Sequence, residues 1–134
     1  AHFHAMFVGF MANMAMAGIY CLYPYFTGRM YSQGMGNTHF WFWQIGIFTK
    51  VTMMYLLGFN YFPRWVVDYL DLPQWSTPQL ILTGAAYLIG LGFIVFVYNI
   101  MRSSTRGVAV SGDPWAIGDS DSAKAGSAKP VPAE

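Results

Sequence analysis

Two histidines, His2 and His4, stand two positions apart at the start of the chain, with Phe3 between them. Imidazole is a common ligand of iron, copper and zinc. On an α-helix with 3.6 residues per turn, side chains two positions apart point about 200° apart. The two imidazoles could therefore each serve a separate centre on either side of one helix, and they cannot easily hold one ion together. The alternative is a pair of polar residues at a membrane interface.

The other residues with possible metal chemistry have plainer interpretations. Cys21 is the single cysteine, so it can form no intrachain disulfide, and we expect it to be a small buried side chain. The nine methionines could bind copper(I), but methionine is also an ordinary packing residue. The amine of Ala1, followed by His2, could bind copper(II) if Ala1 were a mature terminus. We expect His39 to be an interfacial residue at a helix start.

Lys50 is the one charged residue between Arg29 and Arg64. An ionised side chain in the middle of a membrane span costs roughly 2.5 to 3.5 kcal/mol, so this lysine should face protein or water, or be neutral. Two roles stay open for it, a structural ion pair and a step on a proton path.

The composition is typical of a membrane protein. Of the 134 residues, 55% are hydrophobic and only 10% are charged, against roughly 25% in soluble domains. No charged side chain occurs between residues 5 and 28 or between residues 72 and 101, and each run exceeds the roughly 20 residues that cross a bilayer. The net charge is +1 with scattered basic residues, so we expect the lipid bilayer, and no nucleic acid, as a partner.

We predict an all-α membrane protein whose transmembrane region covers residues 1–101. Its three transmembrane helices are expected at residues 3–25, 37–59 and 78–101. Pro78 suits the first turn of the third helix, where an N–H group would have no partner, and Arg102 is expected to end that helix. Residues 102–134 are rich in Ser, Gly, Ala and Pro, which predicts a mostly disordered tail.

Small residues recur at every fourth position in two of the predicted helices. They are Ala5, Gly9 and Ala17 in the first helix, and Ala86 and Gly90 in the third. Such rows let helices approach each other closely in lipid. We therefore expect these faces to pack against partner helices.

The arginines predict the orientation of the chain. Arg29 lies alone in the first connection and Arg102 and Arg106 follow the third helix, whereas Arg64 shares its loop with two aspartates. Because cytoplasmic loops carry an excess of Lys and Arg, the first connection and the tail are predicted to be cytoplasmic. The amino-terminal end is then outside, on the same membrane face as Arg64.

Several segments, in order, resemble the end of subunit I of the haem-copper respiratory oxidases. The resemblance covers about residues 1 to 101 and corresponds to the last three of about twelve helices in that family. It is carried by His2-Phe3-His4, Tyr25-Phe26-Thr27-Gly28-Arg29-Met30-Tyr31, His39-Phe40-Trp41, Leu57-Gly58, Phe62-Pro63-Arg64 and Asp68-Tyr69. The family implies that these three helices are part of a larger bundle.

The resemblance also implies a role for individual residues. His2 would be the proximal ligand of the high-spin haem that faces copper, and His4 an axial ligand of the low-spin haem. Phe3 would lie between the two haems. Arg64 would bind haem propionates, for which the planar guanidinium is suited, and Asp68 would lie near the haem edge. The copper ligands of the family lie on earlier helices, so no catalytic residue and no copper ligand is assigned to this chain.

The implied function is that of a terminal oxidase of a prokaryotic plasma membrane. Such an enzyme reduces dioxygen to water with electrons from cytochrome c, a blue copper protein or quinol, and moves protons across the membrane. Its partners would be the rest of subunit I and the other oxidase subunits, and the fragment alone is not expected to be active. Two alternatives are a nitric oxide reductase-like relative and a noncatalytic three-helix scaffold of a membrane complex.

Two departures from the family pattern stand close to the implied haem site. Trp65 occupies the place where the family usually has a second arginine, which would leave fewer charges for the propionates. The second helix lacks the usual Pro-Gln-His stretch and carries Lys50-Val51-Thr52-Met53-Met54-Tyr55 instead. The surroundings of the haems are therefore expected to differ from those in most of the family.

Overall fold

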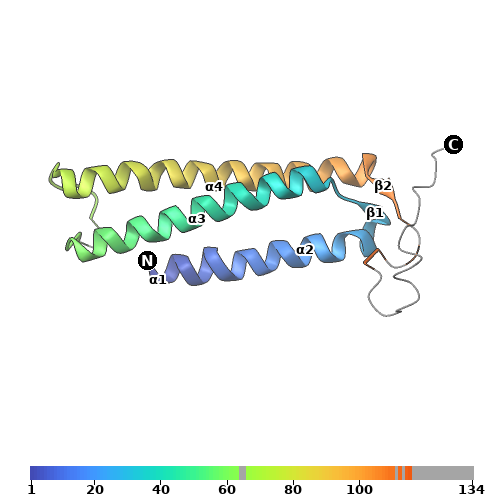
Figure 1. Ribbon diagram of the computed structural model, residues 1–134, viewed down its shortest axis with the longest axis horizontal. Helices are drawn as coiled ribbons and strands as arrows, with labels where there is room; N and C mark the ends of the chain where they lie inside the picture. Colours follow the sequence, from blue (N-terminus) through green and yellow to red (C-terminus); the bar gives the residue numbers. More distant parts are fainter. Residues whose placement is uncertain (64–65, 111, 113, 116–134) are drawn as a thin grey trace.

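The computed structural model describes residues 1–63, 66–110, 112, 114 and 115. Three long helical segments lie side by side, as Figure 1 shows, and the described helices and strands together form an α-helical bundle closed by one short strand pair. The elements are α1 (His2–His4), η1 (Ala5–Met11), α2 (Ala12–Thr27), β1 (Arg29–Met30), α3 (Gln33–Phe59), α4 (Pro73–Arg106) and β2 (Val108–Ala109). The predicted all-α architecture is confirmed.

The first long segment is continuous from α1 through the π-helix η1 to α2. It ends at Gly28, whose φ of 63° is the left-handed conformation that glycine adopts without steric cost. The backbone N–H of Gly28 donates to the carbonyl oxygen of Pro24 at 2.8 Å, which closes the last turn. The prediction placed the end of this span at residue 25, and the helix continues to Thr27.

Two helical segments are long and apolar enough to cross a membrane, His2–Thr27 and Pro73–Arg106. The helix between them, α3, has 27 residues and begins four residues before the predicted span 37–59. At 1.5 Å per residue it is about 40 Å long, which exceeds the roughly 30 Å of a hydrocarbon core. Its passage through the membrane stays a prediction.

Both predicted ends of the third helix were wrong. Pro73 occupies the first turn in place of Pro78, and the N–H groups of Trp75 and Ser76 close that turn by donating to Leu72 O at 2.8 Å. Pro78 is the sixth residue of α4 and lies inside the helix. At the other end α4 continues past Arg102 to Arg106, because nothing in the local sequence breaks it before Gly107.

The start of the expected disordered tail is also ordered. Residues 102–106 are helical, and Val108–Ala109 pairs with Arg29–Met30 as an antiparallel two-stranded sheet. The first residues of the predicted tail are therefore ordered, and the mostly disordered character of the tail stays a prediction. The remainder of the predicted tail, from residue 116, lies outside the described residues.

The core lies where the three segments meet. Met16 from α2, Trp43 and Ile47 from α3 and Phe96 from α4 are buried together. Close approach of α3 and α4 depends on Gly46, where an added Cβ would lie 2.6 Å from Ile89 Cγ1 and 3.1 Å from Ala85 O. Closely packed small residues of this kind are typical of helix pairs in membranes.

The small residues expected to face partner helices differ in their surroundings. A Cβ at Gly9 would meet Ile47 at 3.5 Å, so the first helix packs as expected. In α4 the buried small residues are Ala85 and Gly92, whereas Ala86 and Gly90 are exposed. Ala86 and Gly90 thus lie on an exposed face of α4, and their packing against partner helices stays a prediction.

Asn99 ties the end of the bundle that carries the first connection and the strand pair. Its side chain has 0% exposure, accepts a hydrogen bond from Ser32 N at 3.1 Å and donates to Ser32 O at 3.0 Å. The hydroxyl of Tyr23 donates to Ile100 O at 3.0 Å, and Arg29 Nη1 donates to Gly107 O at 2.9 Å. Polar groups of this end are thus satisfied within the chain.

Candidate functional site

The two histidines predicted as ligands occupy α1, the first helical turn of the chain. His2 is exposed and His4 is half-buried. Their backbone is α-helical, with φ −69° and ψ −37° at His4, so the geometry behind the expected angle of about 200° is present. Among the described residues no hydrogen bond engages Nε2 of either ring. Two imidazoles with an accessible nitrogen fit the donor chemistry of haem iron.

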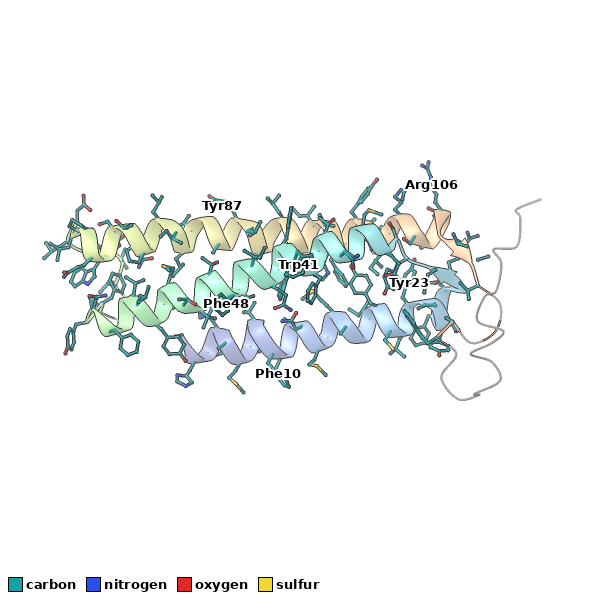
Figure 2. All side chains as sticks on the ribbon, in the orientation of Figure 1. Phe10, Tyr23, Trp41, Phe48, Tyr87 and Arg106 are labelled. Carbon is teal, nitrogen blue, oxygen red and sulfur yellow. The ribbon has the colours of Figure 1, made fainter. Side chains whose placement is uncertain are left out.

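Phe3 lies between the histidines as a large apolar surface. It is 70% exposed, stacks on Phe7 with ring centroids 5.4 Å apart and 7° between the planes, and meets the ring of His4 edge to face at 5.8 Å. Further along the same segment Phe10 is also exposed, and Figure 2 shows its side chain pointing away from the other helices. The exposed face of the first helical segment that carries Phe3 and Phe10 is therefore an apolar surface that a further apolar partner can cover.

Tyr55 of α3 reaches His2 across the bundle. Its hydroxyl lies 3.5 Å from His2 Nδ1, and the two rings meet edge to face with centroids 5.8 Å apart. The contact leaves Nε2 of His2 available. The sequence reasoning did not assign a role to this residue, because 53 positions separate the partners and only the fold brings them together.

Lys50 lies on α3, the same helix as Tyr55. The described residues provide no carboxylate within ion-pair distance of this lysine. An ion pair for Lys50 would thus need a partner outside the described residues, and both of its predicted roles remain open.

The loop between α3 and α4 contains the residue predicted to bind haem propionates, Arg64, and the residue predicted to lie near the haem edge, Asp68. Arg64 and Trp65 lie outside the described residues. Asp68 is exposed, and its Oδ1 accepts a hydrogen bond from the N–H of Tyr69 at 2.9 Å. Figure 1 shows that the connection between α3 and α4 and the amino terminus lie toward the same end of the bundle. The predicted roles of both residues stay predictions.

A largely apolar cavity of about 560 Å³, with a few polar side chains in its wall, opens between the first helical segment and α3. His39 lines it and is 5% exposed, with Nδ1 3.3 Å from the hydroxyl of Tyr20 and with no partner for Nε2 among the described residues. Gln44 Nε2 donates to Asn13 Oδ1 across the same cavity at 3.1 Å. The expectation that His39 marks a helix start was wrong: it is the seventh residue of α3 and its face points into the bundle.

No group of three or more His, Cys, Asp or Glu side chains capable of holding a metal ion occurs in the described part of the chain. The metal-binding potential of the described residues therefore rests on single imidazoles, which is the pattern of axial ligands rather than of a closed metal cage.

The apolar helices define an integral membrane protein, and the two imidazoles in the first turn are its candidate haem ligands. The chain belongs to the Cytochrome C and Quinol oxidase polypeptide I family, whose model matches residues 1–88. This match confirms the resemblance that the short motifs indicated.

Curated relatives agree with this assignment. The chain is 36% identical over 121 residues to a cytochrome c oxidase subunit 1 of Corynebacterium efficiens and 33% identical over 121 residues to that of Corynebacterium diphtheriae, in each case over 90% of the chain. It is 33% identical over 118 residues, 88% of the chain, to a cytochrome c oxidase subunit 1 of Bacillus sp. (strain PS3). It spans 21%, 22% and 19% of these relatives' length. No solved structure matches the chain.

Proposed function

We propose that this chain is part of the catalytic subunit I of a terminal oxidase that reduces dioxygen to water and translocates protons. Electrons would come from cytochrome c, a blue copper protein or quinol. The observation that carries the proposal is the pair of imidazoles on α1, with Nε2 of each ring unengaged, inside the segment that matches the family. The rest of subunit I and the other oxidase subunits are the partners.

Within this proposal the chain holds two different haems. His2 binds the iron of the high-spin haem through Nε2, and His4 binds the iron of the low-spin haem. When bound, the two haems and a copper ion held by other helices supply the electron transfer and dioxygen chemistry. The chain would contribute the two ligand nitrogens, which the helix places about 200° apart on different sides of α1.

Phe3 would lie between the two haems in this arrangement. Its exposed ring and the stacked ring of Phe7 offer apolar surfaces against which a porphyrin can pack. An apolar contact of this kind excludes water from the haem edges and fixes the spacing between them. Phe3 thus positions the two haems without binding a metal.

Arg64 and Asp68 complete the site on the loop side. Arg64 would bind haem propionates through its planar guanidinium, and Asp68 would lie near the haem edge. Their assignment depends on the resemblance and on the shared end of the bundle that the amino terminus and this loop occupy. The same end would face outward from a prokaryotic plasma membrane, with the carboxy-terminal tail in the cytoplasm.

Two substitutions test the proposal in the native membrane complex that contains this chain. His2→Ala should remove the haem that reacts with carbon monoxide, and His4→Ala should remove the haem that does not, with dioxygen consumption lost in both. His39→Ala is the matched control, because it deletes an imidazole that lines the cavity between the first helical segment and α3 rather than one on α1, and it should retain both haems. If both α1 variants kept both haems, the ligand assignment would fail and a scaffold role would remain.

A further inference from the structure

Tyr55 and His2 form one contact between the first turn of the chain and α3. The hydroxyl oxygen lies 3.5 Å from His2 Nδ1, and the rings are inclined at 75°. On its other side Tyr55 stacks on Phe59, with centroids 6.5 Å apart and 28° between the planes. Although Tyr55 is 37% exposed, its ring is held between the rings of His2 and Phe59. His2 therefore meets a positioned group rather than a freely rotating one.

We infer that Tyr55 is a positioning residue for His2: its hydroxyl oxygen accepts a hydrogen bond from Nδ1–H and aims Nε2 at the high-spin haem. This inference rests on the proposed function. A neutral imidazole that binds a metal through Nε2 carries its proton on Nδ1, so the group at Nδ1 must accept. Ligating histidines nearly always have such a partner, which fixes the orientation of the ring and the basicity of the ligand nitrogen.

The partner of His2 comes from a stretch of α3 already singled out in the sequence. Tyr55 lies in the stretch Lys50-Val51-Thr52-Met53-Met54-Tyr55, where the chain departs from the usual Pro-Gln-His. Within the described residues the Tyr55 hydroxyl is the polar group in contact with His2 Nδ1. This chain therefore supplies a phenol to orient its proposed high-spin haem ligand.

The bond has a predictable electronic effect. When the Nδ1–H group donates a hydrogen bond, the imidazole gains anionic character and its ligand nitrogen becomes more basic. A more basic ligand favours oxidised iron and strengthens the iron–nitrogen bond. A length of 3.5 Å marks a weak hydrogen bond, so the effect should be modest. Removing the hydroxyl should raise the midpoint potential of the high-spin haem and lower its iron–histidine stretching frequency, with the low-spin haem unchanged.

Tyr55→Phe in the native complex tests the inference, because it removes the hydroxyl and keeps the ring that packs on His2 and Phe59. The readouts are a redox titration of the carbon monoxide-reactive haem and the iron–histidine stretching band in resonance Raman spectra. Tyr61→Phe is the matched control, since Tyr61 lies at the same end of the bundle and is 91% exposed. We expect both readouts to shift in Tyr55→Phe and neither in Tyr61→Phe.

A second variant separates the hydroxyl from the ring. Tyr55→Leu removes both groups. If the hydroxyl acts on His2, the midpoint potential and the stretching frequency should shift equally in Tyr55→Leu and Tyr55→Phe. If ring packing acts instead, these readouts should shift only in Tyr55→Leu, which would overturn the inference. Unchanged potential and stretching frequency in Tyr55→Phe would also overturn it. These outcomes are distinct from failure of the proposed function, which would appear as an unsubstituted complex without a carbon monoxide-reactive haem.

Discussion

The two ends of the helical bundle differ in how far their polar side chains are hydrogen-bonded within the chain. At the end that carries the strand pair, Asn99 is fully buried and bonds both backbone groups of Ser32. At the amino-terminal end, His2 and Phe3 are exposed, and the polar contact of His2 is a long one to Tyr55. Both ends contain polar side chains in apolar surroundings, but only one satisfies them internally.

This difference separates structural polar residues from functional ones. A buried amide that saturates its hydrogen bonds within the chain stabilises the fold and offers nothing to a ligand. An imidazole that leaves one nitrogen available at an apolar surface stabilises little and can bind a metal. Substitutions at the strand-pair end should therefore change stability, and substitutions on α1 should change haem content.

Asn99→Leu should give the largest loss of stability at the strand-pair end. It removes the side-chain partner of both backbone groups of Ser32. The Ser32 carbonyl keeps a hydrogen bond from the Gly36 N–H at 2.9 Å, so the Ser32 N–H is the group left unpaired, at a cost of about 1 to 3 kcal/mol. We expect a loss of stability of this size, seen as a lower midpoint of detergent-induced unfolding of the native complex. Asn60→Leu is the control, because Asn60 is exposed, and a similar loss there would contradict this account.

Gly46→Ala should disturb the packing of α3 on α4 while the polar contacts at both ends stay in place. The added methyl would lie 2.6 Å from Ile89 Cγ1 and 3.1 Å from a backbone oxygen, so the helices must separate. Overpacking of this kind costs about 1 to 3 kcal/mol, which outweighs the gain in helix propensity. We therefore expect a lower thermal or detergent unfolding midpoint for Gly46→Ala. Gly90→Ala is the control, because a Cβ added at Gly90 has no neighbour within 4 Å, and its midpoint should not fall.

Gly28→Ala tests the turn that joins α2 to the strand pair. Gly28 has φ 63°, and a residue with a Cβ pays about 1 kcal/mol in this conformation. We expect a lower unfolding midpoint for Gly28→Ala and no loss for Gly34→Ala, since Gly34 is helical with open space around it. Equal midpoints for the two variants would show that the turn does not constrain the chain.

The smallest effect concerns Tyr31 in the connection after the strand β1. Burial raises the pKa of this phenol above its ordinary value of 10.0. The unfolded state then ionises first, so stability should fall as the pH rises above about 10 and towards the raised pKa. Tyr31→Phe should reduce this slope, which can be read from unfolding midpoints collected across that pH range, and an unchanged slope would exclude the contribution.

The sequence was sufficient for the helices and the family, because long charge-free runs and short motifs are local signals. It misplaced the ends of α4, since Pro73 and Pro78 are equally suited to a first turn and the choice depends on the preceding loop. It did not predict the pairing of Arg29–Met30 with Val108–Ala109, which joins segments far apart in the chain.

The candidate site likewise contains residues that the sequence predicts and a contact that it does not. His2, Phe3 and His4 could be selected from their spacing and from the resemblance, because all three lie within one turn. The contact of Tyr55 with His2 could not, because it requires the packing of α3 against the first helical segment. A family pattern also gives no help where this sequence departs from it, as it does at residues 50–55.

The central claim is that His2 and His4 serve two unlike haems, and a visible spectrum of the native complex tests it most directly. Reduced-minus-oxidised spectra of the detergent-solubilised complex would be recorded with and without carbon monoxide. The account predicts two haem populations, of which only one shifts with carbon monoxide. A complex with no haem, or one whose haems all respond alike, would contradict it.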